Sequence, residues 1–155
     1  MAVQKLIAVV VLLVSSTLSA TAVELTPLQQ VGKMIFFDTN LSAVRNQSCA
    51  TCHAPEVGWS GPDSTLNSLG GVYNGSFSDR FGNRRPPSAA YVAQSPVLRW
   101  DKKEKVFIGG AFWDGRATGK RLKSTAAEQA QGPFLNPVEH GFADAVCVVS
   151  RVCNA

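Results

Sequence analysis

The spacing of apolar residues predicts a mainly helical chain, beginning with a helix near the N-terminus. Thr26 and Pro27 suit an N-cap and a first helical position. Apolar side chains then recur at helical spacing, at Leu28, Val31 and Ile35. The pattern predicts a helix that ends near Asp38.

Two further helical patterns lie toward the C-terminus. Thr118 suits the N-cap of a helix that runs to about Gln131, where Gly132-Pro133 would stop it. The stretch from Ala143 to Cys153 predicts a last helix. The apolar faces of these two helices would be formed by Leu122, Ala126 and Ala130 and by Val146, Val149 and Cys153.

Between these patterns, periodicity gives way to turn-forming residues. Residues 57–88 are rich in Gly, Pro, Ser and Asn, which predicts a long ordered loop. Loops of this length are usually functional or disordered, and wrapping the face of a cofactor is the functional option. Residues 91–97 fit a short helix or an extended segment equally well. Residues 107–115 are aromatic and glycine-rich, a composition that permits close backbone approach to a flat cofactor.

The first 22 residues read as a secretory signal peptide. Lys5 precedes an apolar run from Leu6 to Val14, and Ala20-Thr21-Ala22 is a small-x-small cleavage site. The run is too short to cross a bilayer, so we expect no membrane anchor. Cleavage would leave residues 23–155 as one domain in the periplasm.

The charge of this mature segment is mildly basic. It keeps 14 basic and 11 acidic side chains, a net of +3, and has no basic run with interleaved aromatic residues. We therefore expect no nucleic-acid partner.

The sequence Cys49-Ala50-Thr51-Cys52-His53 is the pattern of covalent c-type haem attachment. Ser48 suits the N-cap of a short helix that places both sulfurs along one porphyrin edge and aims the histidine at the iron. We expect one haem c, held by Cys49 and Cys52, with His53 as the iron ligand. This identifies a cytochrome c-type haem domain.

Two other readings of this motif are weaker. A zinc site would need a second ligand pair at similar spacing, and the only other histidine and cysteines are His140, Cys147 and Cys153. A redox CxxC motif would leave the histidine unexplained and lacks the usual strand-helix context. Cys147 and Cys153 would lie about 240° apart around a helix, so a disulfide between them is not expected.

The sixth position of the iron is open to two interpretations. Electron-transfer haems usually fill it with Met or His, whereas peroxidases leave it free for substrate. The candidates are Met34, which otherwise fits the core of its helix, and His140, which otherwise fits a solvated or locally hydrogen-bonded histidine.

Five motifs in order resemble the bacterial di-haem cytochrome c peroxidases, a group that includes the MauG-like proteins. They are residues 32–38 (GKMIFFD), 49–53 (CATCH), 112–117 (FWDGRA), 129–133 (QAQGP) and 136–139 (NPVE). The resemblance covers roughly residues 28–151, which correspond to the N-terminal, peroxidatic half of such a protein. It implies a class I cytochrome c-like haem domain with long ordered loops.

The resemblance implies roles for three catalytic residues. Trp113 matches the tryptophan that relays electrons between the two haems, Glu139 the distal glutamate that handles protons, and Gln129 a distal glutamine. From the residues alone, Trp113 could equally be a core aromatic and Glu139 a capping-box glutamate following Asn136. Arg116 could pair with Asp114 or meet a haem propionate.

The chain also departs from this family in three places. No histidine lies between His53 and His140, where many members carry one that closes the resting iron, so we expect a permanently open or water-bound iron. His140 replaces the usual methionine after the distal glutamate. Arg85 replaces an asparagine associated with calcium, which argues against a calcium site.

The C-terminal half with a second haem motif is absent from this sequence, so we expect a fragment or a separate partner that supplies electrons. The leading hypothesis is reduction of hydrogen peroxide with electrons from a second haem domain, a cytochrome or a cupredoxin. The alternatives are a mono-haem electron-transfer cytochrome c and a MauG-like enzyme that oxidises a protein side chain.

Overall fold

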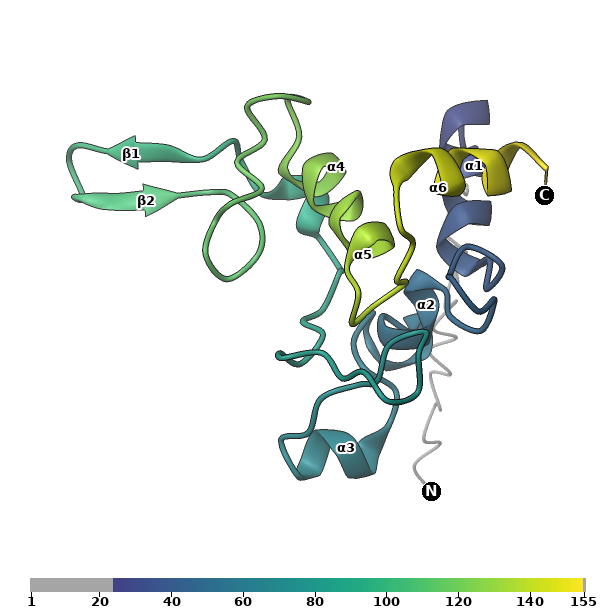
Figure 1. The fold of residues 1–155 in the computed structure, drawn as a ribbon. Helices are drawn as coiled ribbons and strands as arrows, with labels where there is room; N and C mark the ends of the chain where they lie inside the picture. Colours follow the sequence, from purple (N-terminus) through teal and green to yellow (C-terminus); the bar gives the residue numbers. More distant parts are fainter. Residues whose placement is uncertain (1–23, 155) are drawn as a thin grey trace, which may run out of the picture.

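The computed structural model describes residues 24–154, so the predicted signal peptide at residues 1–22 lies outside the described residues. The chain is mainly helical, as predicted (Figure 1). Its α-helices are α1 (Pro27–Phe37), α2 (Cys49–Cys52), α3 (Ser64–Ser68), α4 (Thr125–Ala130), α5 (Gly132–Leu135) and α6 (Ala145–Cys153). Two 3-10 turns, η1 (Pro55–Val57) and η2 (Val92–Gln94), and two strands, β1 (Arg99–Asp101) and β2 (Val106–Ile108), complete it. Within residues 24–154, no helix has the length and apolar character needed to cross a bilayer.

The predicted starts of the first two helices are confirmed. Thr26 caps α1 in a capping box, in which its hydroxyl accepts from the Gln29 N–H at 3.3 Å and Gln29 Oε1 accepts from the Thr26 N–H at 2.9 Å. Ser48 precedes α2, and its N–H donates to Thr51 Oγ1 at 3.0 Å. Helix α1 ends at Phe37 with Asp38 as C-cap, and it packs against α2.

The long loop at residues 57–88 contains a helix that the composition did not predict. Asp63 caps α3 by accepting from the Leu66 N–H at 2.8 Å. Glycines lie on both sides of this five-residue helix, and so short a helix between glycines leaves no clear periodicity in the sequence. The remainder of the segment is loop, as expected.

The helix predicted from Thr118 to Gln131 is wrong at its N-terminal end. Helix α4 begins only after Ser124, which caps it by accepting from the Ala127 N–H at 3.2 Å. Residues 119–123 instead fold as a loop around the carboxylate of Glu128, which takes up the backbone N–H groups that a helix would have used. After α4, Gly132-Pro133 starts α5 rather than ending helical structure.

The aromatic segment at residues 107–115 is not a cofactor-binding turn alone, because it begins as strand β2. Strands β1 and β2 pair antiparallel with Trp100 opposite Phe107. The resulting hairpin projects away from the helices (Figure 1). Gly109, which follows β2, allows close packing within the chain itself, since a Cβ there would lie 2.1 Å from the Pro96 carbonyl oxygen.

The packed core of the described residues is small and partly polar. Its buried hydrophobic side chains are Leu41, Ala54, Ala117 and Phe142. A hydrogen-bonded cluster joins residues 42–47 to residues 74–76: Ser76 Oγ donates to Asn46 Oδ1 at 2.9 Å and accepts from the Val44 N–H at 3.0 Å. This cluster fixes the loops beside α2.

Candidate haem site

Helix α2 presents the cysteines and the histidine of the CATCH motif from a single turn. Cys49 and Cys52 are both half-buried, and His53 forms the C-cap with its N–H donating to the Cys49 carbonyl at 2.9 Å. The His53 Nδ1 lies 3.3 Å from the Trp59 carbonyl oxygen. A carbonyl only accepts, so Nδ1 carries the proton and Nε2 keeps the lone pair that an iron ligand needs.

Burial shifts the pKa of each of these three side chains in the direction that favours its neutral form. It raises the pKa of Cys49, and it raises that of Cys52 to about 11. It lowers the pKa of His53, which hydrogen bonds to the Trp59 and Pro87 carbonyls partly offset. A neutral imidazole is the form that binds a metal.

Glu139 is held by its backbone on both sides. It follows α5, and its N–H donates to the Asn136 carbonyl at 3.0 Å while its own carbonyl accepts from the Ser76 N–H at 2.7 Å. Gly75 packs against this turn, where a Cβ would lie 2.5 Å from the Val138 carbonyl oxygen. No helix begins at Asn136, whose side chain accepts from the Val138 N–H at 3.2 Å, so the capping-box interpretation of Glu139 is wrong.

The Glu139 carboxyl interacts electrostatically with the two cysteines of α2. Burial raises its pKa, against the lowering effects of the Arg116 charge and of a hydrogen bond with Asn136. Its charge in turn adds to the raised pKa of both Cys49 and Cys52. Hydrogen bonds hold the same turn against the loops beside α2, because the Glu139 carbonyl accepts from the Ser76 N–H at 2.7 Å and the His140 carbonyl accepts from the Ala43 N–H at 2.8 Å.

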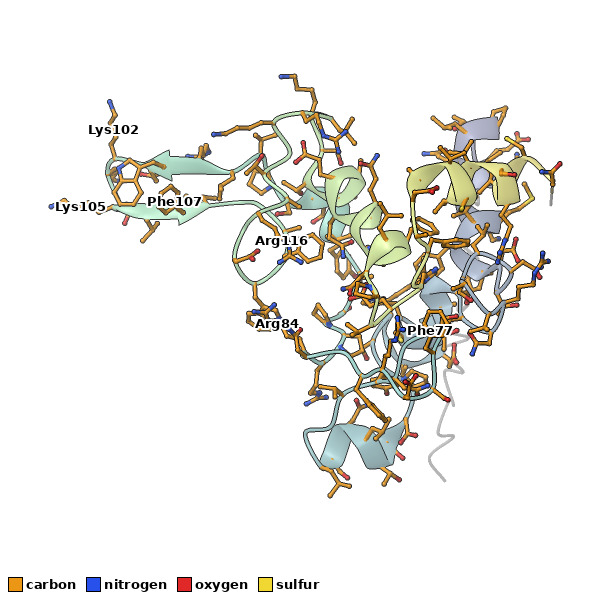
Figure 2. The ribbon with its side chains drawn as sticks, viewed as in Figure 1. Phe77, Arg84, Lys102, Lys105, Phe107 and Arg116 are labelled. Atoms are coloured by element: carbon orange, nitrogen blue, oxygen red, sulfur yellow. The ribbon has the colours of Figure 1, made fainter. Side chains whose placement is uncertain are left out.

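The loop after the hairpin carries Trp113 and Arg116. Figure 2 shows the position of Arg116. Arg116 Nη1 contacts Asp114 Oδ2 at 2.8 Å, which is the predicted ion pair, and its guanidinium also stacks 3.7 Å from the centroid of the Phe112 ring. Trp113 is 76% exposed, so the core-aromatic interpretation is wrong. Gln129 lies half-buried on α4, and no described hydrogen bond links it to Glu139.

The two candidate sixth ligands have different surroundings. His140 is buried, its Nδ1 is hydrogen bonded to the Leu41 carbonyl, and its ring meets Phe134 edge-on at 5.1 Å. This is the locally hydrogen-bonded histidine of the two interpretations. Met34 is 64% exposed on α1, so its expected place in the protein core is wrong.

Sequence reasoning missed the residues that support the site through their backbone. The Trp59 carbonyl sets the tautomer of His53, while Gly75 and the Ser76 N–H hold the Glu139 turn. These contacts use atoms that every residue has, so composition carries no signal for them. The turn-forming composition of residues 57–88, which includes Gly75 and Ser76, predicted a loop there but not these contacts.

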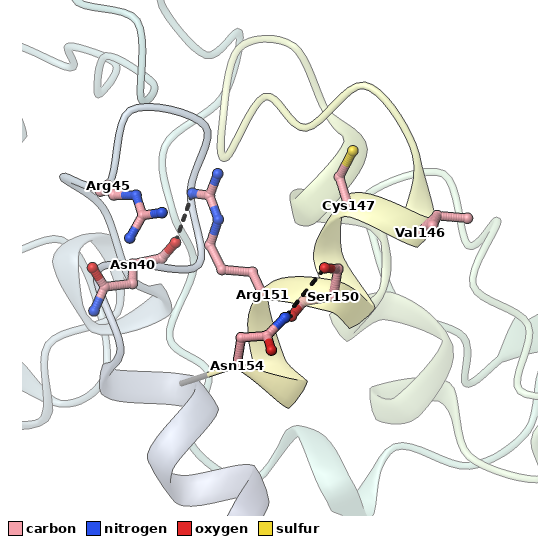
Figure 3. Close-up of a pocket in the computed structure, with 7 residues that line it drawn as sticks. All are labelled: Asn40, Arg45, Val146, Cys147, Ser150, Arg151 and Asn154. Carbon is pink, nitrogen blue, oxygen red and sulfur yellow. Dashed lines mark hydrogen bonds between the residues drawn. The ribbon is translucent and has the colours of Figure 1, made fainter.

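A cavity of about 510 Å³ lies elsewhere, between α6 and the loop after α1 (Figure 3). Its walls include Cys147, Ser150 and Arg151, and Arg151 Nη1 donates to the carbonyls of Asn40 at 2.9 Å and Ser42 at 2.6 Å. No predicted site residue lines it. Cys147 and Cys153 are not joined to each other, as the spacing predicted, and both are free and exposed.

The described residues fit a haem in two respects. The thiols and the His53 Nε2 are presented from one helical turn, with the Nδ1 proton already taken up by a carbonyl. The domain also buries few hydrophobic side chains of its own and leaves large ones on α1 exposed, including Leu28, Met34 and Phe37. A large apolar prosthetic group would complete such a core.

One family of known proteins matches most of this chain. The family model for di-haem cytochrome c peroxidase matches residues 27–155. The methylamine utilization protein MauG of Paracoccus denitrificans is 36% identical over 125 residues, covering 81% of this chain and 30% of that protein. The cytochrome c551 peroxidase of Pseudomonas aeruginosa is 33% identical over 111 residues, covering 72% of this chain and 24% of that protein.

A solved structure shows the same fold. The diheme peroxidase BthA of Burkholderia thailandensis superposes with a TM-score of 0.71 at 31% identity, covering 86% of this chain and 31% of that one. The chain therefore spans about a quarter to a third of the length of these relatives.

Proposed function

Because this chain belongs to the di-haem cytochrome c peroxidase family, whose members bind c-type haem, we propose that it reduces hydrogen peroxide at a haem c attached to Cys49 and Cys52. His53 would be the iron ligand. The observation that carries the proposal is the presentation of Cys49, Cys52 and His53 from one helical turn, with His53 Nδ1 3.3 Å from the Trp59 carbonyl oxygen.

The chemistry divides between the haem and the protein. A haem held by Cys49, Cys52 and His53 would supply an iron that binds peroxide and passes electrons to it. Glu139 would accept a proton from the peroxide and return it to the oxygen that leaves as water. The overall reaction consumes one peroxide, two electrons and two protons and yields two waters.

Three other residues would tune the acidity of Glu139, line the site or supply electrons to it. The Arg116 charge opposes the rise in the pKa of Glu139 that burial causes, and so favours the carboxylate form that acts as a base. Arg116 could also meet a haem propionate, since its pairing with Asp114 is at the surface. Gln129 would lie on the distal side. Trp113 offers an exposed indole through which electrons enter from a second haem domain, a cytochrome or a cupredoxin.

A MauG-like oxidation of a protein side chain is the second candidate function, and it would use the same residues. The exposure of Trp113 supports this function too, because a surface indole can carry electrons from the side chain of a protein substrate just as it can from an electron-donor protein. A signal peptide at residues 1–22 would place either activity in the periplasm.

Replacing Glu139 with Gln tests the proposal. E139Q keeps the shape and removes the base, so we expect the rate of peroxide consumption by the haem-loaded protein to fall about 100-fold or more. In the wild type, the rate should fall as the pH drops through the raised pKa of Glu139, because the protonated carboxyl no longer accepts. Stopped-flow peroxide kinetics measure both.

The matched control is E56Q, the same change at an exposed glutamate on η1. It should retain the wild-type rate, and both variants should contain one haem per chain. An E139Q protein that consumes peroxide as fast as E56Q would show that Glu139 is not the proton-handling group.

A further inference from the structure

The β1–β2 hairpin carries an aromatic face that the described chain leaves largely exposed. Trp100 and Phe107 are cross-strand partners, so their side chains share one face, and their rings meet at 5.0 Å. Trp100 is 49% exposed and Phe107 is 70% exposed. A two-stranded hairpin alone is marginally stable, so an uncovered aromatic pair on one is an unusual surface.

The tip of this hairpin is hydrogen bonded and basic. Asp101 Oδ1 accepts from the N–H groups of Lys103 at 2.9 Å and Glu104 at 3.0 Å, which fixes the turn. Lys103 is paired with Glu104 at 3.6 Å. Among the described residues, Lys102 and Lys105 have no carboxylate partner, and Figure 2 shows both extending from the end of the hairpin.

The positive charge of the chain is concentrated in this region. Residues 99–123 carry eight basic and three acidic side chains, a net of +5, whereas residues 24–98 carry five of each. A patch of this sign steers acidic partners and repels basic ones.

We propose that the hairpin face of Trp100 and Phe107, with Lys102 and Lys105 at its edge, is the docking surface for an acidic electron-donor protein. An aromatic centre with a charged rim is the usual anatomy of a protein interface. The identity of the partner as an electron donor rests on the proposed function, and Trp113 follows the hairpin on the same basic segment.

Two other occupants fit less well. A second copy of this chain would bring two segments of net +5 together, which costs free energy. In a membrane anchor, the aromatic rings would lie at the tip of the hairpin and the lysines farther from it. Here the tip itself is charged and contains Glu104.

Binding of a strongly acidic cupredoxin to the haem-loaded ferric protein tests this proposal by titration calorimetry. We expect K102E and K105E each to raise the Kd at least about fivefold at low ionic strength and to lose most of that effect in about 0.5 M salt. F107S should raise the Kd at both salt concentrations, because apolar contact is not screened.

Matched controls are K33E, which makes the same charge change on exposed α1, and F81S, which removes an exposed aromatic ring in the 72–88 loop. Both should bind the cupredoxin like the wild type. The proposal is overturned if the wild-type protein does not bind, or if K105E binds as tightly as K33E. It is also overturned if phosphatidylglycerol vesicles, rather than the cupredoxin, bind in a manner that depends on Lys105 and Phe107.

The titration uses no peroxide, so its outcome is independent of the proposed activity. Peroxide consumption with a small-molecule reductant measures that activity without a protein donor. Loss of binding with intact consumption would reject the docking surface alone, and the reverse would reject the peroxidase function alone.

Discussion

Gly75 fits its place because it lacks a side chain. A Cβ there would lie 2.5 Å from the Val138 carbonyl oxygen and 2.9 Å from that of Glu139, and both obstacles are backbone. We expect G75A to displace the turn that holds Glu139. The free energy of unfolding should fall by about 1–3 kcal/mol, and the peroxide rate by about tenfold or more, since small misplacements of a catalytic group are costly.

Gly32 provides the contrast for this substitution. It lies inside α1, and a Cβ added there would meet nothing within 4 Å, so G32A should stabilise the helix by about 0.5–1 kcal/mol. Chemical denaturation of both variants, with peroxide kinetics alongside, makes the comparison. A G75A protein as stable and as fast as G32A would mean that the Gly75 contact does not position Glu139.

For single residues, the sequence predicted which side chains carry the chemistry better than it predicted which residues hold them in place. The residue types at Cys49, Cys52 and His53 specify their own chemistry, so the motif could be read directly. Trp113 and Met34 were harder, because apolar character predicts burial and both are exposed. The partners of Glu139 and His53 are backbone atoms, which no residue type announces.

Among the elements, the loop before α4 depends on one carboxylate. Glu128 accepts from the N–H groups of Gly119 at 2.8 Å, Arg121 at 2.6 Å and Leu122 at 2.9 Å. The hydrogen bond from Leu122 is the main cause of its lowered pKa. Because the folded state lowers this pKa, the stabilisation is present above the unfolded value and is lost as the pH falls through the folded one.

We therefore expect amide hydrogen exchange at Gly119, Arg121 and Leu122 to lose protection as wild-type protein is acidified below the ordinary pKa of a glutamate. E128Q should show weak protection at every pH, because an amide offers one acceptor oxygen in place of two. E104Q, at the hairpin tip, is the control and should behave as wild type. Equal protection in E128Q and E104Q would contradict the role given to this carboxylate.

Elements with local signals were predicted, and those set by distant contacts were not. Thr26, Ser48 and the stretch at residues 143–153 carry cap or periodicity signals, and α1, α2 and α6 lie where expected. Helix α4 starts late because Glu128 reaches back to the preceding loop. The hairpin was missed because each strand has only three residues, too few for alternation to stand out.

The whole molecule is a domain whose own core is small. Among residues 24–154, the buried hydrophobic side chains are few, and large apolar residues on α1 stay exposed. The sequence predicted a mainly helical haem domain, and comparison confirms the family and the fold. The fold also ties the Glu139 turn to the loops beside α2, since the carbonyls of Glu139 and His140 accept from the N–H groups of Ser76 and Ala43, and spacing along the chain cannot show such long-range contacts.

The optical spectrum of the ferric, haem-loaded protein, recorded before and after adding hydrogen peroxide, tests the central claim most directly. The claim is that a haem on Cys49 and Cys52 has a sixth position open to substrate. We predict a high-spin spectrum that changes rapidly when peroxide is added. A six-coordinate low-spin spectrum that peroxide leaves unchanged would contradict the claim and identify an electron-carrier cytochrome instead.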